Sequence, residues 1–258
     1  MSTLRSDLET LLGSWRSTLP AEWRSRFDGV ELRFDAIPPL PGSAIWPSNV
    51  FRALHDLDPA HVRAVIFGND PYTKVEQATG RSFEQGDIAD WKTQIRTRRV
   101  SPSLRSILQA AVLTKFPSVP RTEIARKIEK GEIVLPAPPG VWPGWAKQGV
   151  LWLNRALTFS VFKDPERAAH KNLWAPFTSR VLRILVEEAK SRPVAFVMWG
   201  GTAQELEKPI ARQRDALGAA NVKIVKSGHP QMVATYFAHG NPLEAINTAI
   251  GHPAVRWL

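Results

Sequence analysis

Four short apolar runs stand out along the chain, and longer segments with helical spacing of apolar residues separate them. The runs are Val62–Phe67, Gly149–Asn154, Val194–Trp199 and Val222–Val225. Short runs of this composition, bounded by polar residues and glycine, are typical of strands that are covered on both faces. The pattern therefore predicts four buried strands.

The segments between these runs predict helices. Helical patterns cover Asp7–Arg26, Leu104–Leu113, Thr122–Lys130, Leu173–Ala189, the stretch from Ala203 onward and Pro242–Ile250. Two proline-rich passages, Ile37–Gly42 and Leu135–Gly144, are predicted to be loops. Strands that alternate with helices indicate the α/β class: a single domain over residues 1–258, with a central four-stranded, mostly parallel sheet flanked by helices.

Polar residues follow the ends of the predicted strands. Asp70 comes just after the first strand, Asn154 ends the second, Gly200 follows the third and His229 follows the fourth. The carboxyl ends of parallel strands share one edge of the sheet, where open α/β sheets bind ligands. We therefore expect an acid, an amide and an imidazole in one pocket, although the local sequence by itself favours Asp70 as the cap of a turn.

Composition narrows the classes of function. The 258 residues contain no cysteine, which excludes disulfides, thiol nucleophiles and thiolate metal sites. No apolar run is long enough to span a membrane and no signal-peptide pattern opens the chain, so a cytoplasmic protein is expected. The net charge of +10 and the arginine-rich stretch Ile95–Arg105 favour binding to a polyanion such as DNA over a merely basic surface.

Several motifs carry a resemblance to a known family. They are G-N-D-P-Y-T (Gly68–Thr73), S-P-S-L (Ser101–Leu104), W-A-K-Q-G-V-L-W-L-N (Trp145–Asn154), F-V-M-W-G (Phe196–Gly200) and His229-Pro230. In this order and spacing, the chain resembles the family 1 uracil-DNA glycosylases from Trp15 to Trp257. The resemblance implies their α/β fold and hydrolysis of the bond between uracil and deoxyribose, after the nucleotide is flipped out of the DNA.

The resemblance assigns the chemistry to two residues and base recognition to four. Asp70 would stabilise positive charge on the sugar and orient the attacking water, and His229 would act as a neutral donor to uracil O2, so a low pKa is expected. Asn154 would donate to O4 and accept from N3–H, which cytosine cannot match.

The remaining base contacts come from the first motif and the loop after it. Tyr72 would lie against uracil C5 and exclude the methyl group of thymine, and Phe83 would stack on the ring. The backbone N–H groups around Asn69 and Asp70 would complete a binding site for O2. The resemblance implies no cofactor and no metal, and a monomer that acts on single- or double-stranded DNA.

Further residues would contact the DNA backbone and the base stack. By the resemblance, Ser103, Ser227 and Thr202 would bind phosphates, although all three could be ordinary cap or turn residues. Counting from His229 places Val233 at the position that inserts into the stack to support flipping, but the segment that follows is shorter than in the family, so Met232 is an equal candidate.

Two positions of the first motif depart from the family: Asn69 stands in place of its glutamine, and Thr73 in place of its closing histidine. The loss of that imidazole affects the water network beside the catalytic aspartate. Two hypotheses follow. The first is a repair enzyme that releases uracil and leaves an abasic site; the second is a protein that binds uracil-containing or abasic DNA with weak or no turnover.

Overall fold

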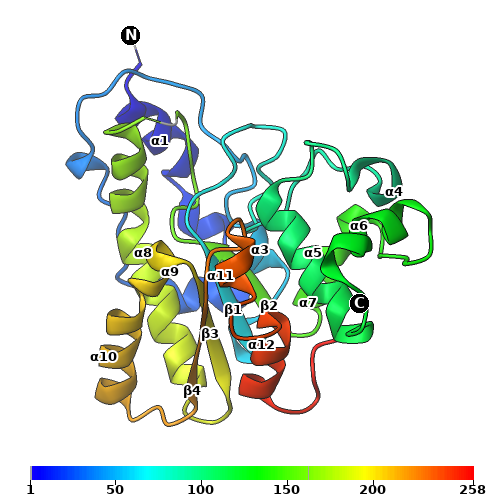
Figure 1. Cartoon of the computed structure of the whole chain (residues 1–258). Coiled ribbons are helices and arrows are strands. Elements are labelled where there is room, and N and C mark those ends of the chain that lie inside the picture. Colours follow the sequence, from blue (N-terminus) through cyan, green and yellow to red (C-terminus); the bar gives the residue numbers. More distant parts are fainter. Residues whose placement is uncertain (1, 162) are drawn as a thin grey trace.

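The four predicted strands form one parallel sheet in the computed structural model, which describes residues 2–161 and 163–258 (Figure 1). The strands are β1 (Ala64–Gly68), β2 (Val150–Asn154), β3 (Val194–Trp199) and β4 (Val222–Ser227), in the spatial order β2-β1-β3-β4. All three neighbouring pairs are parallel, and Gly68 of β1 lies opposite Asn154 of β2. The four strand ends therefore share one edge of the sheet, as predicted.

Helices cover both faces of the sheet. The α-helices are α1 (Leu4–Leu12), α2 (Ala21–Arg24), α3 (Arg52–His55), α4 (Trp91–Gln94), α5 (Pro102–Lys115), α6 (Arg121–Glu129), α7 (Pro138–Ala146), α8 (Glu166–Glu188), α9 (Gly201–Gln204), α10 (Glu207–Leu217), α11 (Val233–Tyr236) and α12 (Pro242–Ile250). Four 3-10 turns, η1 (Trp15–Thr18), η2 (Ser25–Phe27), η3 (Phe34–Ala36) and η4 (Pro59–His61), lie in the first quarter of the described chain. Within the described residues, no helix combines the length and the apolar character needed to cross a membrane.

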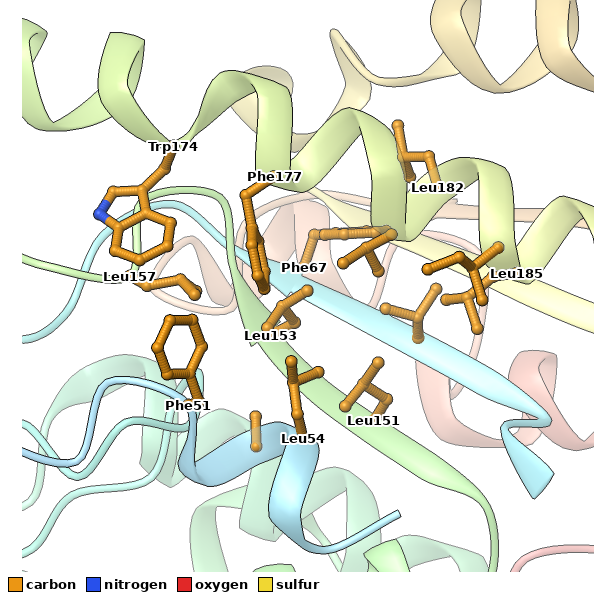
Figure 2. Close-up of a cluster of buried hydrophobic side chains, with 14 of the residues drawn as sticks. Phe51, Leu54, Phe67, Leu151, Leu153, Leu157, Trp174, Phe177, Leu182 and Leu185 are labelled. Atoms are coloured by element: carbon orange, nitrogen blue, oxygen red, sulfur yellow. The ribbon is translucent and has the colours of Figure 1, made fainter. Parts of the chain in front are cut away.

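The strands contribute side chains to two separate hydrophobic cores, because successive side chains of a strand point to opposite faces of the sheet. Val65 and Phe67 of β1 pack with α8 and the N-terminal segments, whereas Ala64 and Ile66 pack with α5, α7 and α12. Figure 2 shows the first core, in which Phe177 of α8 lies over the sheet. β1, β2 and β3 are buried on both faces, which explains their continuous apolar sequence.

Several helices differ from the prediction: the segment Asp7–Arg26 is divided among α1, η1, α2 and η2, the short helices α3, α4 and α11 and the helix α7 were not predicted, and α8 has other bounds. The passage Leu135–Gly144, predicted to be a loop, contains most of α7: Pro138 opens the helix, where an N–H would have no partner anyway. Pro143 does interrupt the helix interior, but burial of Trp142 and Trp145 compensates for the lost hydrogen bond. α8 begins at Glu166 rather than Leu173, and this earlier start places an additional residue at the site.

Candidate active site

A cavity of about 240 Å³ opens at the carboxyl edge of the sheet. Its lining comes from the ends of β1 and β2, from the loops after β1 and β4, and from the starts of α5 and α8. The lining residues are Gly68, Asn69, Asp70, Pro71, Tyr72, Thr73, Arg81, Phe83, Ser103, Asn154, Arg167 and His229. The predicted acid, amide and imidazole are thus brought together, with both predicted aromatic residues beside them.

Asn154 presents an amide with no internal partner. The residue is 4% exposed, and its side chain forms no hydrogen bond with any other residue that the structure describes. The residue lines the cavity, and its amide is not among the fully buried polar atoms that lack a partner, so the amide is accessible from the cavity and available to a ligand. Gly68 opposite it makes the space: a Cβ there would come closer to Asn154 Oδ1 than the 3.0 Å that real Cβ atoms respect.

Asp70 is held by three donors on a single carboxylate oxygen. Oδ2 accepts from Asn69 Nδ2 at 2.6 Å and from Arg167 Nε at 2.7 Å, and Arg167 Nη2 lies 2.6 Å away. Asn69 thus orients the catalytic candidate through its side chain, a contact that sequence reasoning did not anticipate. Thr73 lines the same cavity but is exposed, and the positive group beside Asp70 is instead Arg167.

His229 has the hydrogen-bonding state that its predicted role requires. The backbone N–H of Gln231 donates to Nδ1 at 3.2 Å, so Nδ1 carries no proton and Nε2–H is the donor of the neutral ring. Burial lowers the pKa of His229 below its ordinary value of 6.5. Gly200, with φ of +86°, allows this approach, because a Cβ there would lie 2.8 Å from His229 Cβ.

Tyr72 and Phe83 form the aromatic part of the lining. The Tyr72 hydroxyl lies 2.8 Å from Ser101 Oγ, and burial raises the pKa of Tyr72 to about 12, so the phenol stays neutral. Phe83 has φ of +58°, a left-handed conformation that costs a non-glycine residue about 1–2 kcal/mol. Ser82 holds it there, since its N–H donates to Trp152 O at 3.2 Å and its Oγ donates to Ile66 O at 3.2 Å.

A buried ionic network fixes the loop that carries Phe83. The guanidinium of Arg81 donates to both oxygens of Asp56, with Nη2 to Oδ1 at 2.7 Å, and Nη1 lies 2.8 Å from Glu84 Oε2. The Arg81 side chain is only 5% exposed, and these two carboxylates neutralise it. Sequence reasoning missed Arg81, whose partner Asp56 lies 25 positions away and leaves no local signal.

The predicted DNA contacts lie in different surroundings. Ser103 lines the cavity, Thr202 is exposed, and the Ser227 hydroxyl donates to Gly228 O at 3.1 Å. Met232 and Val233 are exposed apolar side chains, at 62% and 40%. Both are accessible to DNA, so the choice between them stays open.

The lining of this cavity defines a class of protein. The cavity at the edge of the parallel sheet holds a carboxylate, a neutral imidazole donor and an amide without a protein partner, and aromatic rings form its sides. This combination suits hydrolysis of a bond to a flat heterocyclic ligand. Among the described residues, no group of three or more His, Cys, Asp or Glu side chains is placed to hold a metal ion.

Comparison with known proteins identifies the family. The model of the uracil DNA glycosylase superfamily matches residues 55–250. The uracil-DNA glycosylase of Rhizobium meliloti is 31% identical over 250 residues, which is 95% of this chain and 89% of the relative. That of Streptococcus thermophilus is 30% identical over 221 residues, 83% of this chain and 84% of the relative. The chain belongs to the uracil DNA glycosylase superfamily.

Solved structures confirm the fold. The wild-type UNG of Nitratifractor salsuginis superposes with a TM-score of 0.68 at 20% identity, covering 96% of this chain and 98% of that one. Mimivirus uracil-DNA glycosylase superposes with a TM-score of 0.58 at 20% identity, over 83% and 75% of the two chains. The predicted α/β class with a central four-stranded sheet is therefore confirmed.

Proposed function

We infer that this protein is a uracil-DNA glycosylase, which hydrolyses the bond between uracil and deoxyribose in DNA, releases uracil and leaves an abasic site. The observation that carries the inference is the amide of Asn154, which forms no hydrogen bond with a described residue and lines one cavity with Asp70 and His229 in a chain of this superfamily. An amide reserved in this way supplies one donor and one acceptor, which is the pattern that uracil O4 and N3–H need.

The chemistry divides between the two charged ends of the breaking bond. Cleavage leaves positive charge on the sugar, which the Asp70 carboxylate would stabilise while it orients the attacking water. Negative charge develops on the departing uracil, and His229 Nε2–H would donate to O2. The low pKa of His229 supports this role, because a neutral imidazole donates without itself losing a proton to the base.

Recognition of uracil would rest on shape as well as on hydrogen bonds. Tyr72, fixed through its hydroxyl by Ser101, would stand against C5 and clash with the methyl group of thymine. Phe83 would stack on the ring. Its strained backbone supports such a role, because strain of this kind is concentrated at functional sites that the surrounding structure holds in place.

The protein would bind DNA mainly through the phosphates of the DNA backbone. Ser103, Ser227 and Thr202 would donate to phosphate oxygens, and Met232 or Val233 would enter the base stack as the nucleotide leaves it. The net charge of +10 would add sequence-independent, salt-sensitive affinity. We propose that the protein acts as a monomer, in the cytoplasm.

The test uses single-stranded and duplex oligonucleotides that carry one uracil, incubated with the protein in the presence of a chelator and then treated with alkali. Strand cleavage at uracil and not at thymine is expected, and Asp70→Asn should lower the rate by roughly 10²–10⁴ while DNA binding persists. Asp215→Asn on α10, with a side chain that is 67% exposed, is the matched control. Intact strands together with a gel shift would support the damage-binding hypothesis instead.

A further inference from the structure

Arg167 occupies a place that conflicts with the chemistry assigned to Asp70. Its guanidinium lies 2.6–2.7 Å from Asp70 Oδ2, and this ion pair reduces the negative charge that the carboxylate can offer to a positive sugar. A second positive charge beside the developing one is also repulsive. The pair therefore suits the enzyme without DNA better than it suits the reacting complex.

The two partners of this ion pair differ in exposure. The Asp70 side chain is 10% exposed, whereas that of Arg167 is 39% exposed. Arg167 is the second residue of α8, and a cation in the first turn of a helix is disfavoured by the helix dipole. An exposed arginine at an unfavourable helix position, drawn onto a carboxylate in the cavity, can exchange that partner for another anion.

DNA brings such an anion to this place. A flipped nucleotide stays attached to the strand by the phosphates on either side of it, so a nucleotide in the cavity carries phosphates to the cavity mouth. Arginine binds phosphate through paired N–H donors in the same planar geometry as it binds a carboxylate. A phosphate therefore competes directly with Asp70 for the guanidinium.

We propose that Arg167 is a positioning residue that DNA displaces: it pairs with Asp70 in the DNA-free enzyme and moves to a backbone phosphate beside the flipped nucleotide. Asp70 then regains its full charge only when a nucleotide is in the cavity. This inference rests on the proposed function. It assigns to DNA binding a second effect, which is to free the carboxylate.

Asn69 keeps Asp70 in place during the exchange. Its Nδ2 donates to the same oxygen at 2.6 Å, so the carboxylate retains one oriented contact after the guanidinium leaves. Oδ1 accepts no hydrogen bond from the residues that the structure describes, and it can therefore face the water and the sugar. The two neighbours thus have separable roles, one in DNA binding and one in catalysis.

The experiment compares Arg167→Gln, Arg167→Lys and Asn69→Ala with the wild type. Binding is measured by fluorescence anisotropy over a series of salt concentrations, with a single-stranded oligonucleotide that carries 2′-fluoro-2′-deoxyuridine, which resists hydrolysis. KM and kcat are measured on the corresponding uracil oligonucleotide. Arg183→Gln is the matched control, since Arg183 is exposed on the same helix, about 24 Å further along at 1.5 Å per residue.

Exchange onto phosphate predicts a specific pattern. Arg167→Gln should reduce the slope of log Kd against log salt by about 0.7, the value of one phosphate contact on a single strand, and raise KM about tenfold with a smaller change in kcat. Arg167→Lys should restore the slope, Asn69→Ala should lower kcat at an unchanged slope, and Arg183→Gln should match the wild type.

Two failures are distinguishable in this design. An Arg167→Gln slope equal to that of the wild type, with a fall in kcat alone, would show that the arginine stays on Asp70 and would overturn the inference. Absence of uracil release by the wild type would instead overturn the proposed function, and the anisotropy comparison reads DNA binding without any turnover.

Discussion

Substitution of Gly68 by alanine is the most direct test of how the amide of Asn154, which is proposed to recognise the base, is held in place. The new Cβ would overlap Asn154 Oδ1 and lie 2.7 Å from Ser82 Cβ, about 0.7 Å short of the ordinary 3.4 Å contact. The backbone has little freedom to move, because Gly68 is paired with Asn154 across the sheet and its carbonyl accepts from the N–H of Arg155 at 3.0 Å. The amide must therefore rotate away.

The size of the effect follows from these contacts. Overpacking of a well-packed interior costs about 1–3 kcal/mol, which should appear as a lower free energy of unfolding in urea. A displaced Asn154 leaves two polar groups of the base unpaired, at about 1–3 kcal/mol each, so kcat/KM for uracil release should fall by roughly 10²–10⁴. Release is followed with a uracil oligonucleotide and alkaline cleavage.

Two further variants decide whether the steric reasoning is right. Gly144→Ala in α7 is the matched control: a Cβ there meets nothing within 4 Å, and the helix should gain about 0.5–1 kcal/mol. In an Asn154→Ala background, the stability cost of Gly68→Ala should shrink, since the closest contact is gone. A Gly68→Ala enzyme with kcat/KM within threefold of the wild type would refute the account.

Three predictions concern stability. Burial lowers the pKa of His170 to about 4, so below pH 6.5 the unfolded chain binds a proton that the folded protein does not. The free energy of unfolding should therefore fall by about 3 kcal/mol from pH 7 to pH 4 because of this residue. In urea unfolding, His170→Gln should abolish this contribution to the fall. Arg81→Met leaves the partly buried Asp56 without its cation and the buried Glu84 with only Arg52, 3.8 Å away, and should cost about 3 kcal/mol; a loss below 1 kcal/mol would contradict the network. Ser101→Ala removes the cap of α5 and the hydroxyl partner of Tyr72, for a loss of about 1–2 kcal/mol in the same assay, where no change would argue against both contacts.

The sheet was predictable because its signal is local. β1, β2 and β3 are buried on both faces, so each appears in the sequence as an unbroken apolar run, and β3 has the predicted bounds Val194–Trp199. The cap of α5 is equally local, since Ser101 Oγ accepts from the N–H of Leu104 three residues on. From parallel strands alone, one could infer that Asp70, Asn154 and His229 meet at one edge.

The contacts that prepare the site were not predictable in this way. Arg167 lies 97 residues from Asp70, and the helix that carries it was predicted to begin after it. The tautomer of His229 depends on one backbone N–H, and the φ of +58° at Phe83 depends on hydrogen bonds from Ser82 to two strands. Such features arise from packing between distant segments, and no spacing or composition in the sequence encodes them.

The order of the strands explains why glycines accompany the functional side chains. β1 and β2 are neighbours, and Gly68 at the end of β1 leaves the space in which the amide of Asn154 lies. β3 and β4 are also neighbours, and Gly200 after β3 leaves the space for His229 after β4. In each pair one strand end carries the polar group and the neighbouring end is a glycine without a side chain. A methyl group at either glycine should therefore displace Asn154 or His229 and disturb the site without replacing either residue.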